Sequence, residues 1–178
     1  KKIPHAAITI EDAMMLGRLS DRNEKIIVKL KMEAKTLPEK WSRNVISEVV
    51  GTKFPEEIVV IGGHIDSWDV GQGAHDDAGG CVAAWEALRI IKKIGLQPKR
   101  TIRCVLWTNE ENGGMGNKAY RDMHLGELDN HILAIESDGG VFAPKGFGFT
   151  GSEEAKAIAS QIHKLMAPLG SDNLSDGG

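Results

Sequence analysis

The segment Ile58–Asp66, with the sequence IVVIGGHID, joins a continuously apolar run to two polar side chains across a pair of glycines. Consecutive β-branched residues favour a β-strand, and a run without polar residues is typical of a central strand that is covered on both faces. His64 and Asp66 are two positions apart, so in an extended chain both side chains point to the same side. We therefore predict a buried strand that ends in an imidazole and a carboxylate.

Short β-branched runs alternate with helical patterns along the rest of the chain. We expect strands over Ile26–Lys31, Asn44–Val50, Ile58–Gly62, Ile102–Thr108 and Ile132–Ser137. This alternation predicts an α/β fold, a three-layer α/β/α sandwich with a mixed, mostly parallel sheet.

Three helices are expected to cover that sheet, and a fourth precedes it. The predicted ranges are Gly79–Lys93, Met115–Leu125 and Glu153–Leu169, with a short helix around Ile10–Leu16. A capping box formed by Thr150 and Glu153 would begin the last helix of the sheet region.

The composition excludes several classes of protein. The 178 residues are 41% hydrophobic and 26% charged, as in a globular domain, and the net charge is -3. Nucleic acid is an improbable main partner because phosphate binding needs a basic face. No apolar run approaches the ~18 residues of a membrane span. Cys81 and Cys104 are too few for a disulfide scaffold, and we expect both to be small core residues. A first residue Lys and a small, polar C-terminal segment suggest a piece of a longer protein.

Adjacent acids precede one predicted helix. Asp76 and Asp77 lie between glycines in the segment GAHDDAGG, residues 73–80. Such a pair can simply cap the helix and favour its dipole. Alternatively, one carboxylate is shared between two cations while the other supports it, and the glycines permit the tight turns that this requires.

Acids also follow two predicted strands. Glu110 and Glu111 end the apolar run CVLW, and Asp138 ends the run LAIES. In open α/β sheets, binding sites form beyond the carboxyl ends of the strands, so His64 and these carboxylates should gather at one edge. So many carboxylates would repel one another without a divalent cation. One imidazole with several carboxylates fits zinc, and a shared carboxylate fits a pair of ions about 3.5–4 Å apart.

The order and spacing of four motifs resemble the co-catalytic di-zinc exopeptidases, the family that includes bacterial leucyl aminopeptidases and glutamate carboxypeptidase II. The motifs are GHIDS at 63–67, DDAGG at 76–80, EENGGMG at 110–116 and SDG at 137–139. The resemblance implies a truncated zinc-exopeptidase fold. It also implies the hydrolysis of short peptides, dipeptides with free termini above all.

The resemblance implies a role for each matching residue. The two zinc ions would be held by His64, Asp76, Glu111 and Asp138. His64 and Asp138 would bind one ion, Glu111 the other, and Asp76 would bridge both. Glu110 would be the general base and Asp66 would orient His64. The peptide bond between Asp76 and Asp77 would be cis.

One departure from the family concerns the second zinc ion, which there receives a final histidine from a later strand. None of the other histidines of this chain has a matching context: His5, His75, His124, His131 and His163. We therefore expect a deficient second site here, and weak or absent activity of this piece alone.

The family resemblance also implies a secreted or lysosomal homodimer. Residues 1–21 would lie at the junction with an upstream protease-associated-type domain. Residues 22–178 would form the catalytic domain, incomplete at its C-terminus.

Two alternatives stay open at this point. One is a non-catalytic receptor or binding protein on the same scaffold, and the other is a single-zinc acyltransferase similar to glutaminyl cyclases. Counting the metal ions per chain distinguishes the di-zinc exopeptidase, the binding protein and the acyltransferase.

Residues 146–151 match the dinucleotide-binding pattern GxGxxG. The residues before them do not form the required strand, so we expect a glycine-rich turn.

Overall fold

The computed structural model describes residues 5–33 and 35–177. Its contacts divide the chain into two units, Lys1–Lys40 and Trp41–Gly178. The first unit contains the helix α1 (Ile10–Asp21), in which no residue is buried. The Thr9 hydroxyl accepts the N–H of Asp12 and caps the helix, which confirms a helix in this region.

The strand expected over Ile26–Lys31 does not form. These residues have no regular secondary structure, and no strand pairing in the described part of the chain includes them. A strand exists only where a neighbouring backbone satisfies its N–H and C=O groups, so β-branched content alone does not create one. The prediction is wrong for this segment.

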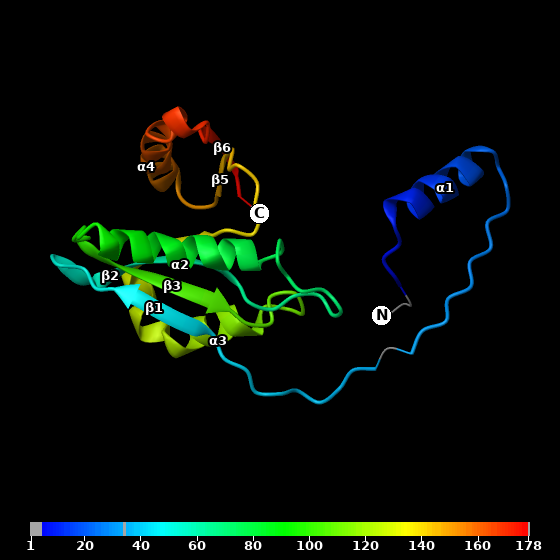
Figure 1. The fold of residues 1–178 in the computed structure, drawn as a ribbon, viewed down its shortest axis with the longest axis horizontal. Helices are drawn as coiled ribbons and strands as arrows, with labels where there is room; N and C mark the ends of the chain where they lie inside the picture. The colour runs from blue at the N-terminus through cyan, green and yellow to red at the C-terminus, as the bar shows by residue number, and fades with distance from the viewer. Residues whose placement is uncertain (1–4, 34, 178) are drawn as a thin grey trace. The chain divides into compact units, whose positions relative to one another are not determined.

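The second unit is built on a four-stranded sheet in the order β1-β3-β2-β4 (Figure 1). The strands are β1 (Val45–Val49), β2 (Phe54–His64), β3 (Arg100–Trp107) and β4 (His131–Glu136). β3 and β4 run parallel to β2, whereas β1 runs antiparallel to β3. This arrangement confirms the mixed, mostly parallel sheet. β2 is longer than expected and continues through both glycines to His64.

Helices cover the two faces of this sheet, which confirms the three layers. On one face, α2 (Ala78–Lys93) packs Ala84 and Leu88 against Cys104 of β3. On the other, α3 (Met115–Met123) places Tyr120 against Val105. In Figure 1 the two helices lie on opposite sides of the strands. The short 3₁₀ helix η1 (Leu125–Asn130) leads from α3 to β4.

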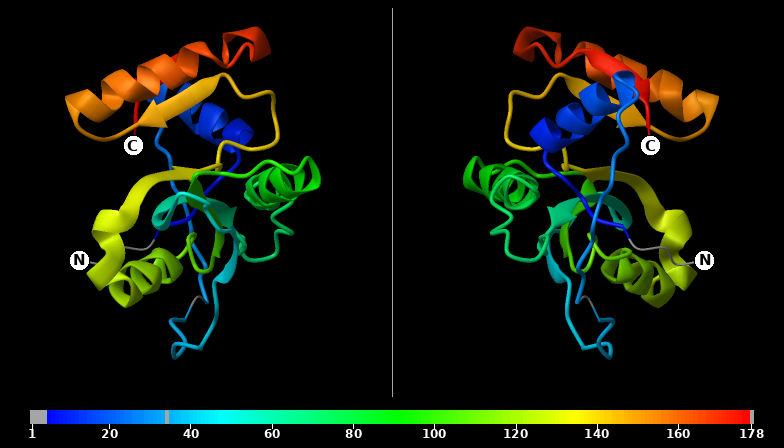
Figure 2. Two further views of the ribbon diagram at one scale, coloured as in Figure 1. Left: turned by 90° about the vertical axis from the view of Figure 1, so that its left-hand side faces the viewer. Right: turned by 90° about the vertical axis from the view of Figure 1, so that its right-hand side faces the viewer.

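A second, two-stranded sheet follows. Its parallel strands β5 (Gly146–Phe149) and β6 (Asn173–Asp176) are connected through α4 (Glu153–Lys164) and η2 (Ala167–Leu169). Figure 2 shows α4 running alongside β5. The prediction of a glycine-rich turn at 146–151 is therefore wrong for its first four positions, which form β5.

No helix of the described residues is both long and apolar enough to cross a membrane.

The ends of α4 also differ from the prediction. Ser152, rather than Thr150, caps the helix by accepting the N–H of Ala155 at 3.2 Å. The helix stops at Lys164 and gives way to η2, which contains Pro168. Proline has no N–H and its ring clashes with the preceding turn, so the α-helix cannot continue through it.

Candidate metal centre

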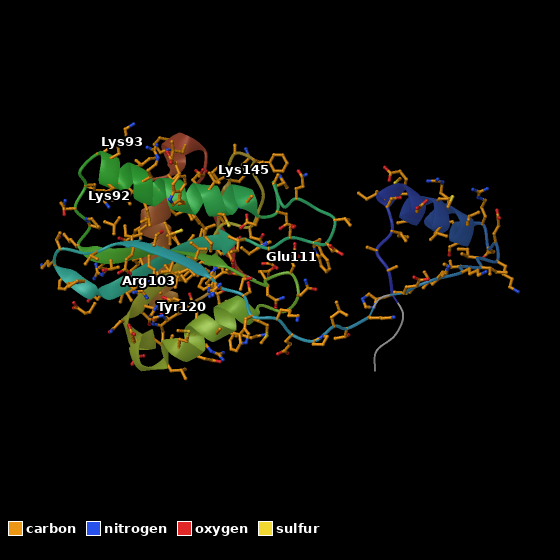
Figure 3. All side chains as sticks on the ribbon, turned by 60° about the horizontal axis from the view of Figure 1, so that its bottom comes forward. Lys92, Lys93, Arg103, Glu111, Tyr120 and Lys145 are labelled. Carbon is orange, nitrogen blue, oxygen red and sulfur yellow. The ribbon has the colours of Figure 1, made fainter. Side chains whose placement is uncertain are left out.

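The predicted site residues meet at the carboxyl end of the four-stranded sheet. The register places His64 of β2 beside Trp107 of β3, and Gly62 beside Glu136 of β4. The loops that follow these strands therefore begin side by side. Figure 3 shows Glu111 in the loop beyond the end of β3.

His64 is the centre of this cluster, and its side chain is only 1% exposed. Its Nε2 atom lies 3.1 Å from Asp76 Oδ1 and 3.2 Å from Asp138 Oδ1. Glu110 Oε2 is 4.0 Å away. The three carboxylates are between 40% and 58% exposed, so the cluster is closed behind the imidazole and open to solvent on the acidic side.

The other ring nitrogen of His64 is held by Asp66. Nδ1 lies 2.9 Å from the main-chain oxygen of Asp66 but 3.7 Å from its carboxylate. Because a carbonyl only accepts, this hydrogen bond places a proton on Nδ1 and directs Nε2 toward Asp76 and Asp138. Asp66 thus contacts the imidazole through its backbone, whereas the sequence suggested its side chain.

The carboxylate of Asp66 binds the next loop instead. Its Oδ1 accepts the N–H of Glu110 at 2.9 Å and its Oδ2 accepts the N–H of Glu111 at 3.2 Å. Two charge-assisted hydrogen bonds therefore fix the backbone of the Glu110–Glu111 pair. The side chains diverge, and Glu111 joins Asp76 while Glu110 faces His64.

Asp77 supports the cluster from inside, although the sequence does not predict it as a metal ligand. It is 1% exposed, and its carboxylate accepts the N–H of His64 and the N–H of Gly80, each at 3.0 Å. Burial raises the pKa of Asp77, while the two hydrogen bonds oppose that shift. The Asp76–Asp77 peptide bond is cis, as the resemblance implied. The sequence indicates this supporting role through the adjacent aspartates, because one of the pair can support the other.

Two overlapping groups could hold a cation. His64, Asp76 and Glu111 form the first, and His64, Asp77 and Asp138 form the second. Within each group the ligand atoms lie within 4.8 Å of one another. Both oxygens of Asp77 already accept backbone N–H groups, so Asp138 and His64 are the freer ligands of the second group.

The surroundings of the Glu111 side chain favour a cation at this place. Its Oε1 atom is buried and has no hydrogen-bond partner in the described chain. Burial raises the pKa of Glu111, and the neighbouring carboxylate of Asp76 adds to the shift. A buried, unpaired carboxylate oxygen beside a second acid costs free energy unless a positive charge is present, so the donor set fits a divalent metal ion.

The His64 imidazole responds to the same acidic surroundings. Burial would lower its pKa, but the hydrogen bond to the Asp66 carbonyl and the charges of Asp138 and Asp77 outweigh it and raise the pKa to about 8. The imidazole must lose that proton to act as a ligand, so cation binding at neutral pH releases it.

The remaining side chains singled out in the sequence lie outside both groups. The ring of His75 packs edge-on against Phe142, with centroids 5.0 Å apart. His124 and His131 surround Tyr120, which Figure 3 shows beside Arg103. The two cysteines are buried and unbridged, which confirms them as core residues.

Comparisons with known proteins point to one family. The sequence profile of Peptidase family M28 matches residues 44–177. Carboxypeptidase Q of Rattus norvegicus is 51% identical over 168 residues, which cover 94% of this chain and 36% of that protein. Carboxypeptidase Q of Homo sapiens is 52% identical over 168 residues, with the same coverage. This chain therefore spans about 36% of the length of these curated relatives.

A solved structure agrees with the sequence matches. The crystal structure of a Peptidase M28 precursor from Shewanella amazonensis superposes with a TM-score of 0.77 at 36% identity, covering 93% of this chain and 37% of that one. The matched residues 44–177 include the whole sheet, both covering helices and each residue of the acidic cluster around His64. The chain belongs to peptidase family M28.

Proposed function

We propose that this chain carries the metal centre of a zinc-dependent exopeptidase that hydrolyses short peptides, in particular dipeptides with free termini. The observation that supports this most strongly is the convergence on His64. Asp76 and Asp138 approach its Nε2 atom to 3.1 and 3.2 Å, and the buried Oε1 of Glu111 has no hydrogen-bond partner in the described chain. The name carboxypeptidase Q borne by the relatives supports a substrate with a free carboxyl terminus.

The chain offers ligands for two zinc ions. His64 and Asp138 would hold one, Glu111 the other, and Asp76 would be shared between them. When bound, zinc supplies Lewis acidity, which polarises the scissile carbonyl and lowers the pKa of water at the site.

Glu110 acts as the general base in this proposal. Its carboxylate is 40% exposed and its Oε2 faces His64 across 4.0 Å, at the open side of the cluster. It takes a proton from the attacking water as the new carbon–oxygen bond forms. It then returns that proton to the amine nitrogen as the carbon–nitrogen bond breaks. Asp66 holds the Glu110 backbone in place for both transfers.

The organisation of the complete protein follows the same resemblance. We propose a secreted or lysosomal homodimer, with residues 1–21 at the junction to a protease-associated-type domain and 22–178 within the catalytic domain. His64 is the only histidine of the described residues in either candidate group, so an ion held by Glu111 and Asp76 would have no imidazole of its own. We therefore expect zinc titration of the chain alone to show one tight and one weak site, with little dipeptide hydrolysis. Full turnover by the chain alone would contradict this.

The decisive experiment counts zinc per chain in the complete protein and measures dipeptide hydrolysis on the same samples. We expect two zinc ions in the wild type, about one in Glu111→Gln and in Asp138→Asn, and a large loss of activity in both variants. Asp122→Asn makes the same chemical change on the exposed surface of α3 and should alter neither quantity. One ion in the wild type would favour the acyltransferase alternative, and none would favour a binding protein.

A further inference from the structure

We propose that Asn44 is a positioning residue of this metal centre, because it ties together the two ends of the loop that carries Glu110 and Glu111. The proposal rests on the proposed function. It adds a residue that lies just before β1, outside the four motifs and without contact to the ligand atoms.

Three hydrogen bonds close the base of this loop. Asn44 Oδ1 accepts the N–H of Thr108 at 3.0 Å, and Asn44 Nδ2 donates to the carbonyl of Gly116 at 2.8 Å. The N–H of Gly116 in turn donates to the carbonyl of Thr108 at 3.0 Å. The amide therefore joins the end of β3 to the first turn of α3, and residues 109–115 form a closed loop between them.

The position of Asn44 follows from the strand register. Val45 of β1 pairs with Leu106 of β3, so Asn44 is the next residue along the same ladder, opposite Trp107. Its side chain continues the ladder to Thr108, where the backbone pairing has ended. An amide suits this place because it offers one acceptor and one donor to one N–H and one C=O.

Gly116 shows how closely the amide fits. A Cβ atom on this buried glycine would overlap Asn44 Oδ1 and the backbone of Thr108. The absence of a side chain at Gly116 thus leaves the space that the Asn44 amide occupies.

The closed loop is held at two places that act on Glu110 and Glu111. Asp66 accepts the N–H groups of both residues, and Asn44 fixes Thr108, two residues before Glu110. Without the Asn44 amide, the loop keeps Asp66 and the bond from Gly116 N–H to the Thr108 carbonyl but loses two of the three hydrogen bonds at its base, so we expect the carboxylates to shift relative to His64. Supporting groups of this kind typically contribute about 10–100-fold to metal affinity or activity.

The test compares Asn44→Ala with Thr101→Val in the complete protein. Thr101 lies at the opposite end of β3, is 2% exposed, and makes two matching main-chain contacts. Its hydroxyl donates to Pro55 O at 2.7 Å and accepts the N–H of Gly51 at 3.1 Å. Both variants should lower the melting temperature, but only the first alters the loop.

The measurements are zinc affinity by competition with a chelating dye, kcat and KM for a dipeptide, and the melting temperature. For Asn44→Ala we expect about 10–100-fold weaker zinc binding and a lower kcat, with KM little changed. For Thr101→Val we expect wild-type zinc affinity and kcat. If the two variants behave alike, the inference is wrong.

Asn44→Asp keeps the size of the side chain and decides the matter if Asn44→Ala does not fold. Its carboxylate still accepts from Thr108 but opposes the Gly116 carbonyl, so zinc affinity should again fall. Wild-type zinc affinity in this variant would overturn the positioning role. Absence of zinc and of hydrolysis in the wild type would instead overturn the proposed function, which keeps the two failures distinct.

Discussion

Asp66 Oδ1 accepts the main-chain N–H of Glu110 at 2.9 Å, although 44 positions separate the two residues along the chain. The side chain that follows β2 therefore determines where the loop after β3 lies. The main-chain oxygen of the same residue contacts His64 at 2.9 Å. Asp66 thus links the imidazole to the proposed base, although it belongs to neither group that could hold a cation.

Asp66→Asn should lower kcat for dipeptide hydrolysis by about 10–100-fold. An amide can accept only one of the two N–H groups, and its NH₂ opposes the other. Steady-state kinetics measure the effect, and Asp69→Asn, a change in the adjacent exposed loop, is the control. Unchanged kcat in Asp66→Asn would show that the two hydrogen bonds are unimportant for the loop.

Glu110→Gln should remove the proposed base while leaving the zinc in place. We expect kcat to fall by about 10²–10⁴-fold, since the amide cannot accept a proton at neutral pH. Zinc content measured on the same sample should stay at the wild-type value. Glu56→Gln on the exposed opposite end of β2 provides the matched control. Joint loss of zinc and activity would identify Glu110 as a ligand.

Gly63→Ala should destabilise the protein by about 1–3 kcal/mol. A Cβ atom there would overlap the Asp77 carboxylate and meet the backbone of Cys81 at 2.8 Å, so α2 would have to move away from β2. Chemical denaturation measures the loss. Gly126→Ala, where the added atom meets nothing within 4 Å, is the control. Equal stability of the two variants would rule out close packing of α2 on Gly63.

The two thiols should be inert in the folded protein near neutral pH. Burial raises the pKa of Cys81 to about 11 and also raises the pKa of Cys104. The thiolate is the nucleophile, so reactivity is suppressed below the raised pKa and increases as the pH approaches it. Ellman's reagent at pH 8 should label neither cysteine until a denaturant is added. Rapid labelling of the native protein would contradict this.

The central part of the fold and the acidic cluster could be predicted because their signals are local. The run Ile58–Ile61 is apolar enough to indicate a buried strand, and the carboxyl-end rule then places His64 at the site. Asp76, Glu111 and Asp138 follow from the same rule applied to neighbouring segments. The structure brings a carboxylate oxygen of each of these acids to within 4.8 Å of a ring nitrogen of His64.

Other features depend on partners that a local pattern does not identify. Ile26–Lys31 has strand composition but no strand pairing, while Gly146–Phe149 looks like a turn and pairs with Asn173–Asp176 across the intervening α4. Asn44 is an unremarkable residue until Thr108 and Gly116 meet it across 64 and 72 positions of sequence. Its contribution becomes visible only in three dimensions.

The buried carboxylate of Asp77 accepts one N–H from His64 on β2 and another from Gly80 in the first turn of α2. The backbone of β2 at His64 and the first turn of α2 are thereby joined through one side chain. We therefore expect that a change in how α2 packs, even one that begins at Leu88 on the covered face of the helix, shifts the position of His64. The proposed metal centre should then respond to apolar substitutions far from any carboxylate.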